Sequence, residues 1–298
     1  MFRKATLIMA AISGVFSVAA SAEDTTLPTL QKIKASGIIN VGHRESSIPF
    51  SYLDDKQKPI GYSMDLCNKI IENVKKDLNM PSLKVNLVPV TSATRIPLMT
   101  NGTVDLECGS TTNSMERQKQ VAFGVATYVA PVRMLVKAGT KLDSLDDLNG
   151  KAVVTTTGTT SDQLIRKNEK GMNIDVKNVY AKDHAESFLM VETGRADAFV
   201  MDEILLAGFI ANAKNPKDFA IVGPTLRAEP YGIMLRKDDP AFKKVVDDTL
   251  KGLMKSGEIN KIYQKWFLSP IPPKNINLSL PMSQELKNAF TNPSDKGV

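Results

Sequence analysis

The chain has 298 residues, and its 38 Lys and Arg against 32 Asp and Glu give a net charge of +6. The basic residues alternate with acidic ones and form no run interleaved with aromatic residues, which argues against a nucleic-acid-binding protein. Only two cysteines are present, Cys67 and Cys108, which excludes a disulfide-rich scaffold. They could form one bridge in an oxidising compartment or stay free in the core, and the sequence leaves both open.

The N-terminal segment predicts a secretory signal peptide, residues 1–22. Arg3 and Lys4 precede an apolar run of 16 residues, which leads to Ala-Ser-Ala, the small-x-small pattern of a cleavage site. A membrane anchor is the alternative, but a spanning helix needs about 20 apolar residues. We therefore expect a soluble periplasmic protein, without a lipid anchor, whose net charge after the loss of Arg3 and Lys4 is +4.

Strand-like and helix-like segments alternate in the first half of the chain. The expected helices cover residues 27–36, 62–78 and 95–100, and the expected strands cover residues 38–42, 83–90 and 103–109. In the second helix Leu66, Ile70 and Val74 recur on one face. Strands separated by helices pair in parallel through crossovers, so this half predicts an α/β sheet.

The same alternation starts again after Gly150. The expected strands are residues 151–158, 178–181 and 196–202, and the expected helices are residues 159–171 and 183–194. One further strand within 229–240 and two helices within 240–267 are too few for a third domain. We expect them to return to the first unit, which then comprises residues 23–131 and 227–298, with residues 132–226 as the second lobe. Two crossings between the lobes would form a hinge and a cleft.

Several motifs carry a resemblance to a known family. They are "VGHRESSIPFSYLDDKQKPIGYSMDLCNKI", "RIPLMTNGTVDLECGSTTNSMERQKQVAF", "GTTSDQLI", "ETGRADAFVMDE" and "IYQKWF". With these the chain resembles the extracellular solute-binding proteins of polar amino-acid ABC transporters, family 3, over nearly the whole predicted mature chain. The details "GHRESSIPFSY", "TSATRIPLM" and "CGSTT" are similar to the glutamate/aspartate-binding branch. One departure is "FGVATYVAP", where the family usually has Phe-Ser-x-Pro-Tyr.

The resemblance implies a two-lobed periplasmic binding protein fold of type II, with a mostly parallel sheet flanked by helices in each lobe. It implies a protein that closes its lobes over L-glutamate or L-aspartate and delivers it to the membrane permease of an ABC transporter. Such a protein is a monomer and has no catalytic residue, cofactor or metal. In an open α/β sheet the ligand lies outside the carboxyl ends of the strands, where the resemblance places its binding residues.

The resemblance implies partners for the α-carboxylate and α-ammonium groups of the amino acid. Arg117 would bind the α-carboxylate through its planar fork, with Ser110, Thr112 and the helix start at Thr160 as further donors. Asp202 would accept from the ammonium. The alternatives are a solvated helix arginine for Arg117 and helix N-caps for Thr160 and Asp202.

The resemblance also implies a second set of residues, which would bind the side-chain carboxylate of the amino acid. Arg44 and Arg95 would pair with it, and Ser92 and His184 would donate hydrogen bonds to it. An arginine in a first helical turn, as expected for Arg95, is unfavourable for the helix dipole and therefore favours a binding role. An isolated histidine such as His184 is more often a surface residue, and His43 is left out because it points to the other side of its strand.

The main alternative is an enzyme, because this fold also hosts periplasmic dehydratases that act on amino-acid-like substrates. Such an enzyme needs a carboxylic acid in the cleft, and none of the candidate positions supplies a spare glutamate. There is no phosphate-binding loop, metal-ligand spacing or nucleophile elbow. A sensor or adhesin built on the same fold is a further alternative, and a product assay separates an enzyme from a binding protein.

Overall fold

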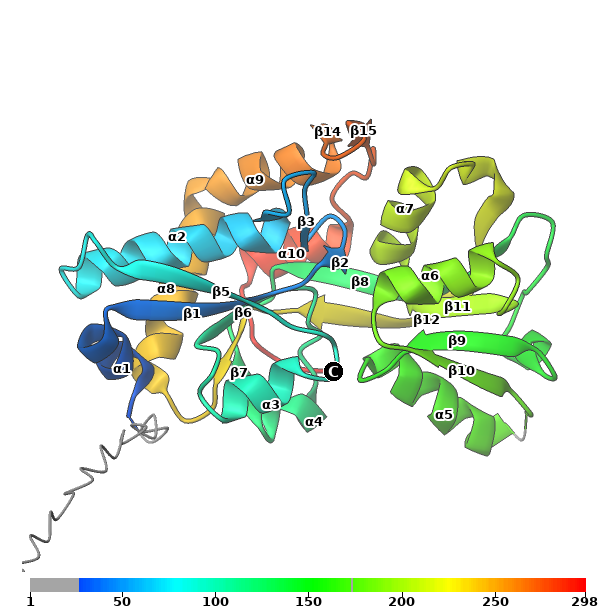
Figure 1. Ribbon diagram of the computed structural model, residues 1–298, viewed down its shortest axis with the longest axis horizontal. Coiled ribbons are helices and arrows are strands. Elements are labelled where there is room, and N and C mark those ends of the chain that lie inside the picture. Colours follow the sequence, from blue (N-terminus) through cyan, green and yellow to red (C-terminus); the bar gives the residue numbers. More distant parts are fainter. Residues whose placement is uncertain (1–26, 173) are drawn as a thin grey trace, which may run out of the picture.

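The protein forms two lobes, each built on one sheet, in a computed structural model that describes residues 27–172 and 174–298 (Figure 1). The predicted signal peptide lies outside the described residues. No helix in the described part of the chain is long and apolar enough to cross a bilayer. The two lobes, their helix-flanked sheets and the α/β class confirm the predicted fold.

The first sheet has the strand order β5-β1-β6-β13-β7. Its strands are β1 (Ile38–His43), β5 (Lys84–Pro89), β6 (Leu106–Cys108), β7 (Val121–Phe123) and β13 (Met234–Arg236). β1 pairs in parallel with β5 and β6, as the intervening helices require. β13 comes from the far end of the chain and pairs antiparallel with β6 and β7, so the returning segment completes the first sheet.

Helices cover the first sheet on both faces (Figure 1). They are α1 (Thr29–Ser36), α2 (Tyr62–Asp77), α3 (Arg95–Thr100), α4 (Met115–Gln118), α8 (Pro240–Ser256) and α9 (Glu258–Phe267). On α2 the predicted stripe of Leu66, Ile70 and Val74 is fully buried. Trp266 on α9 donates to Asp65 on α2, which joins the returning helices to the first part of the chain.

The second sheet has the order β10-β9-β11-β8-β12. Its elements are β8 (Tyr128–Lys137), β9 (Ala152–Thr156), α5 (Thr160–Met172), β10 (Lys177–Ala181), α6 (His184–Glu192), β11 (Ala198–Asp202), α7 (Glu203–Asn212) and β12 (Phe219–Tyr231). β9 pairs in parallel with β10 and β11, whereas β8 runs antiparallel to β11 and β12. Both sheets are therefore mixed, with a parallel core of three strands.

The long strands β8 and β12 run side by side from one lobe into the other (Figure 1). The predicted lobe boundaries, 131/132 and 226/227, fall within these two strands and stay a prediction. Beside the crossing, Tyr128 of β8 and Tyr231 of β12 each lie 5.0 Å from the ring centre of Phe50. The Phe267 ring stacks on Tyr128 at 5.3 Å. Aromatic packing of this kind holds the start of β8 and the end of β12 in the core of the first lobe.

The last thirty residues were not expected to form elements of their own. They contain the hairpin β14 (Pro270–Ile271) and β15 (Ile276–Asn277) and the helix α10 (Gln284–Thr291). A further small sheet, β2 (Ser46–Ser47), β3 (Ser51–Leu53) and β4 (Pro59–Ile60), follows β1. The short strands and the eight-residue helix are too short to show a clear hydrophobic periodicity in the sequence.

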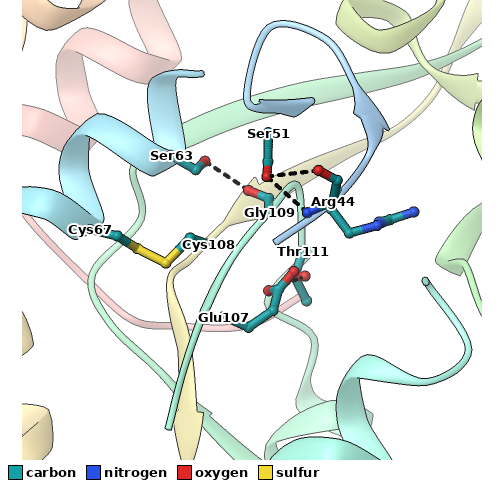
Figure 2. Close-up of a disulfide and its surroundings, with 8 residues drawn as sticks. All are labelled: Arg44, Ser51, Ser63, Cys67, Glu107, Cys108, Gly109 and Thr111. Atoms are coloured by element: carbon teal, nitrogen blue, oxygen red, sulfur yellow. Dashed lines mark hydrogen bonds between the residues drawn. A yellow bond between two sulfur atoms is a disulfide. The ribbon is translucent and has the colours of Figure 1, made fainter. Parts of the chain in front are cut away.

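A disulfide joins Cys67 of α2 to Cys108 at the end of β6, with both residues fully buried (Figure 2). Their Cα atoms are 6.2 Å apart, within the range that a bridge spans. One turn earlier on α2, the Ser63 hydroxyl donates to the Gly109 carbonyl at 2.7 Å. The bridge and this bond together anchor the chain that leaves β6 toward Ser110.

Candidate functional site

All nine predicted site residues are buried, none of them more than 5% exposed. Each ends a strand, lies in the loop after one, or belongs to the first turn of a helix. They are Arg44 after β1, Ser92 and Arg95 before and in α3, Ser110 and Thr112 after β6, Arg117 in α4, Thr160 at the start of α5, His184 at the start of α6 and Asp202 at the end of β11. Two networks described below contain residues of both lobes, so the structure brings much of the predicted set together.

Arg44 leaves β1 with its backbone held on both sides by one serine. The Ser51 hydroxyl accepts from the Arg44 N–H at 2.9 Å and donates to the Arg44 carbonyl at 3.4 Å (Figure 2). Gly109 allows the close approach, since a Cβ atom there would lie 2.9 Å from Arg44 Cγ. Arg44 Nη1 is buried without a hydrogen-bond partner among the described residues.

His184 lies against Arg44, with 3.4 Å between Nε2 and Arg44 Nη2. A guanidinium only donates, so Nε2 accepts and Nδ1 carries the proton. Nδ1 then donates to the Thr156 hydroxyl at 2.9 Å, which donates to Ser187 at 2.8 Å, whose hydroxyl donates to the Asp183 carbonyl at 3.0 Å. Burial and the nearby arginines lower the pKa of His184 well below its ordinary value, which agrees with this neutral tautomer.

Arg95 is held by a second chain of hydrogen bonds. Its Nη1 donates to the Thr111 hydroxyl at 2.6 Å, which in turn donates to Glu107 Oε2 at 2.6 Å. Arg95 Nε, Glu107 Oε1 and the hydroxyl of nearby Ser92 in the loop before α3 are buried without a partner among the described residues. These groups remain able to bond to something other than the protein.

Arg117 spans the space between the lobes. Its Nη1 donates to the Thr112 carbonyl at 2.9 Å and its Nη2 to the Gly158 carbonyl at 3.0 Å. Gly158 has a φ of +81°, and a Cβ atom there would lie 2.8 Å from the backbone of Ala93. Only glycine therefore permits the second lobe to approach the first so closely.

Thr112 and Thr160, one from each lobe, share an acidic partner that the sequence analysis did not single out. Their hydroxyls lie 3.3 Å apart and donate to Glu229 Oε2 at 2.5 and 2.6 Å. The other oxygen of Glu229 accepts from Arg227. Ser110 donates to a neighbouring serine of β2 at 3.2 Å.

Asp202 occupies the N-cap position of α7, but its side chain makes no capping hydrogen bond. Its Oδ2 instead accepts from the Tyr231 hydroxyl, and its Oδ1 is buried without a partner among the described residues. Burial, with the charge of Glu229, raises the pKa of Asp202 to about 8. The capping alternative therefore does not explain this carboxyl group, whereas a cation bound at Oδ1 would.

The buried arginines dominate the electrostatics of the site. Burial, together with the Arg95 charge, lowers the pKa of Arg44 and of Arg117 to about 9. Burial also lowers the pKa of Arg95. Burial thus makes the charged form of each guanidinium less favourable. An anionic ligand beside it would offset this desolvation penalty. A partnerless carboxyl oxygen on Asp202 adds a place for one cation.

Two buried glutamates that the sequence analysis did not single out lie in the hydrogen-bond networks of the site. Glu107 accepts from Thr111, and Glu229 accepts from Thr112 and Thr160 and pairs with Arg227. Glu107 lies between Leu106 and Cys108 in a buried strand of three residues. An acidic residue inside such an apolar strand is the sequence signal that could have identified it as a candidate site residue. In the described part of the chain, no group of three His, Cys, Asp or Glu residues could hold a metal ion.

Comparison with known proteins decides the family. Residues 39–269 match the model of bacterial extracellular solute-binding proteins, family 3. The chain belongs to this family. A glutamate/aspartate import solute-binding protein of Escherichia coli K12 is 50% identical over 99% of this chain and 98% of its own. An L-glutamate/L-aspartate-binding protein of Pseudomonas aeruginosa PAO1 is 52% identical over 98% and 97%.

A solved structure of this family supports the fold. The P235GK mutant of the arginine-binding protein ArgBP from T. maritima has a TM-score of 0.71 and 29% identity, over 80% of this chain and 98% of its own. The relatives of about 50% identity are named as solute-binding proteins and not as enzymes. Membership of this family of solute-binding proteins therefore supports a binding protein over a dehydratase, even though the site contains glutamates.

Proposed function

We propose that the protein captures L-glutamate or L-aspartate in the periplasm and delivers it to the membrane permease of an ABC transporter. It works as a monomer after cleavage of residues 1–22. The names of the relatives at about 50% identity support the ligand class. The observation that carries the proposal is a buried cluster in which Arg44 and Arg95 have partnerless N–H groups and Asp202 has a partnerless carboxyl oxygen.

An acidic amino acid carries two carboxylates and one ammonium, and the cluster contains groups for each. The α-carboxylate binds Arg117, with Ser110, Thr112 and Thr160 as further donors. The ammonium binds Asp202. A buried carboxylate with a raised pKa gains most from a positive partner, because the pair removes the burial penalty on both charges.

The side-chain carboxylate binds Arg44 and Arg95, with Ser92 and His184 beside it. Arg44 meets His184 of the second lobe, so the same carboxylate contacts groups that move together when the lobes close. A ligand favours a conformation only through contacts that the other conformation lacks. Contacts from both lobes therefore make closure depend on the bound amino acid.

The decisive experiment measures dissociation constants for glutamate, aspartate, glutamine and asparagine. The protein is first unfolded and refolded to remove bound ligand. Glutamine places N–H donors against guanidinium donors, and sites of this type reject such analogues by about 10⁴-fold. If the dissociation constant for glutamine is within tenfold of that for glutamate, the arginines do not select for the charged side chain and the proposal fails.

X-ray scattering tests the closure itself. The radius of gyration should fall when glutamate or aspartate saturates the protein and stay unchanged with glutamine at the same concentration. An unchanged radius at saturation with glutamate would contradict closure on the ligand.

A further inference from the structure

The last residues of the described chain lie against the loop that leads to Arg117 (Figure 1). The backbone of Val298 pairs with that loop in both directions, since its carbonyl accepts from Met115 N–H at 2.9 Å and its N–H donates to the Asn113 carbonyl at 3.2 Å. The Asp295 carbonyl accepts from the side chains of Asn113 at 2.8 Å and Gln118 at 2.9 Å. We call residues 294–298 the tail and residues 113–118 the clamp loop.

The clamp loop has little structure of its own. Its helix α4 has four residues, a single turn, which is far too short to be stable by its own hydrogen bonds. Ser114 caps that turn by accepting from the Arg117 N–H at 3.3 Å. The conformation that aims Arg117 at Thr112 and Gly158 must therefore come largely from contacts with other segments.

Two segments hold the clamp loop from different directions. On one side Asn113 N–H donates to the Pro230 carbonyl of β12 at 2.7 Å. On the other side lies the tail, which is itself anchored to α8 because Lys243 pairs with Asp295 at 2.8 Å. Ala126 N–H also donates to the Ser294 carbonyl at 2.9 Å.

We infer that the tail is a positioning element, which holds the clamp loop so that the Arg117 guanidinium is prearranged for the α-carboxylate. This inference rests on the proposed function for the role of Arg117. The family match ends at residue 269, so the tail lies outside the part shared with the family as a whole. We therefore expect the tail to tune affinity and not to create the site, because preorganisation lowers the entropic cost of binding.

A substitution at Gly297 tests the inference without changing any of the proposed ligand-binding residues. A Cβ atom at this position would lie 2.9 Å from both Met115 N and Ser114 C, so Gly297→Ala must push the tail away from the loop. Gly297→Val should do so further. Gly252→Ala is the matched control, because a Cβ atom there meets nothing within 4 Å.

The affinity for glutamate is measured in the wild type and in an Arg117→Lys background, which keeps the charge and loses the fork. Gly297→Ala should weaken binding about tenfold in the wild type, Gly297→Val more, and Gly252→Ala less than twofold. In the Arg117→Lys background Gly297→Ala should change binding less than twofold. Equal losses in both backgrounds, or no loss in the wild type, would overturn the inference.

Amide hydrogen exchange separates this inference from the proposed function, because it needs no ligand. The Met115 N–H should exchange at least tenfold faster in Gly297→Ala than in the wild type or Gly252→Ala. A wild type that binds no acidic amino acid would overturn the proposed function and the role of Arg117, while faster exchange would still establish the tail as the support of the loop. Unchanged Met115 exchange overturns the support itself.

Discussion

The two lobes contribute different chemistry to one site. The first lobe brings three buried arginines, Arg44, Arg95 and Arg117, whereas the second brings the Thr160 hydroxyl, the neutral His184 and the acid Asp202. Two further buried acids lie in the same networks, Glu107 on β6 and Glu229 on β12. An amino acid with a second carboxylate can satisfy both sides only when they meet around it.

The lobes also differ in how they hold their site residues. In the first lobe the Cys67–Cys108 disulfide, the Ser63 bond to Gly109 and the tail fix chain segments that carry few hydrogen bonds of their own. In the second lobe His184 sits on a regular helix and is oriented by a chain of side-chain bonds. Three like charges repel one another, so the side that carries them needs the stronger support.

The largest effect is expected from removing the acid of the second lobe. Asp202→Ala should weaken glutamate and aspartate by about 3 to 5 kcal/mol, because the bound ammonium would be left buried without a counter-charge. Glu203→Ala is the control, since this neighbouring acid pairs with Arg133 at the surface. Calorimetry measures both, and binding by Asp202→Ala within tenfold of wild type would show that the ammonium lies elsewhere.

The charge of the first lobe is tested by Arg44→Ala and Arg95→Ala. Each should weaken glutamate and aspartate by about 2 to 3 kcal/mol, the range for a hydrogen bond to a charged group. Glutamine should change less, because it lacks the second carboxylate. Arg133→Ala, a half-exposed arginine of the second lobe, should leave all dissociation constants within twofold. Equal losses for glutamate and glutamine would contradict the assignment.

The raised pKa of Asp202 predicts that the affinity for the amino acid depends on pH. Below about pH 8 the carboxyl group is protonated in the closed arrangement, and an ammonium binds only the ionised form. Affinity should therefore fall as pH falls from 8 to 6, by up to about tenfold per pH unit. Aspartate dissociation constants at pH 6, 7 and 8 measure the slope. Asp202→Asn should flatten it, and an unchanged slope in that variant would assign the titration to another group.

The smallest effect is expected at the contact between the C-terminal hairpin and the second lobe. Lys274 Nζ donates to the Asn212 carbonyl at 2.5 Å and to the Ala213 carbonyl at 3.5 Å, at the end of α7. Lys274→Met should weaken glutamate binding by about 0.3 to 1 kcal/mol, the size of an exposed cation at a helix C-terminus. Lys237→Met should have no effect, because Lys237 Nζ donates to the Lys119 carbonyl within the first lobe. Equal results for the two variants would exclude a role for the hairpin in closure.

The sequence by itself determined the two α/β units, the return of the chain to the first sheet and the position of most candidate residues at strand ends or helix starts. These follow from local rules: periodicity marks strands and helices, and parallel strands bring their carboxyl ends to one edge. Arg44, for example, directly follows β1, whose last three residues are buried.

Only the tertiary structure decided which side chains meet across long separations. Glu229 joins Thr112 and Thr160, His184 is oriented from Thr156, and the tail reaches the clamp loop from the far end of the chain. The disulfide, left open by the sequence, depends on how α2 packs beside β6. A hydrogen bond or a bridge needs two groups within a few ångströms of each other, and periodicity along one segment carries no information on the distance to another.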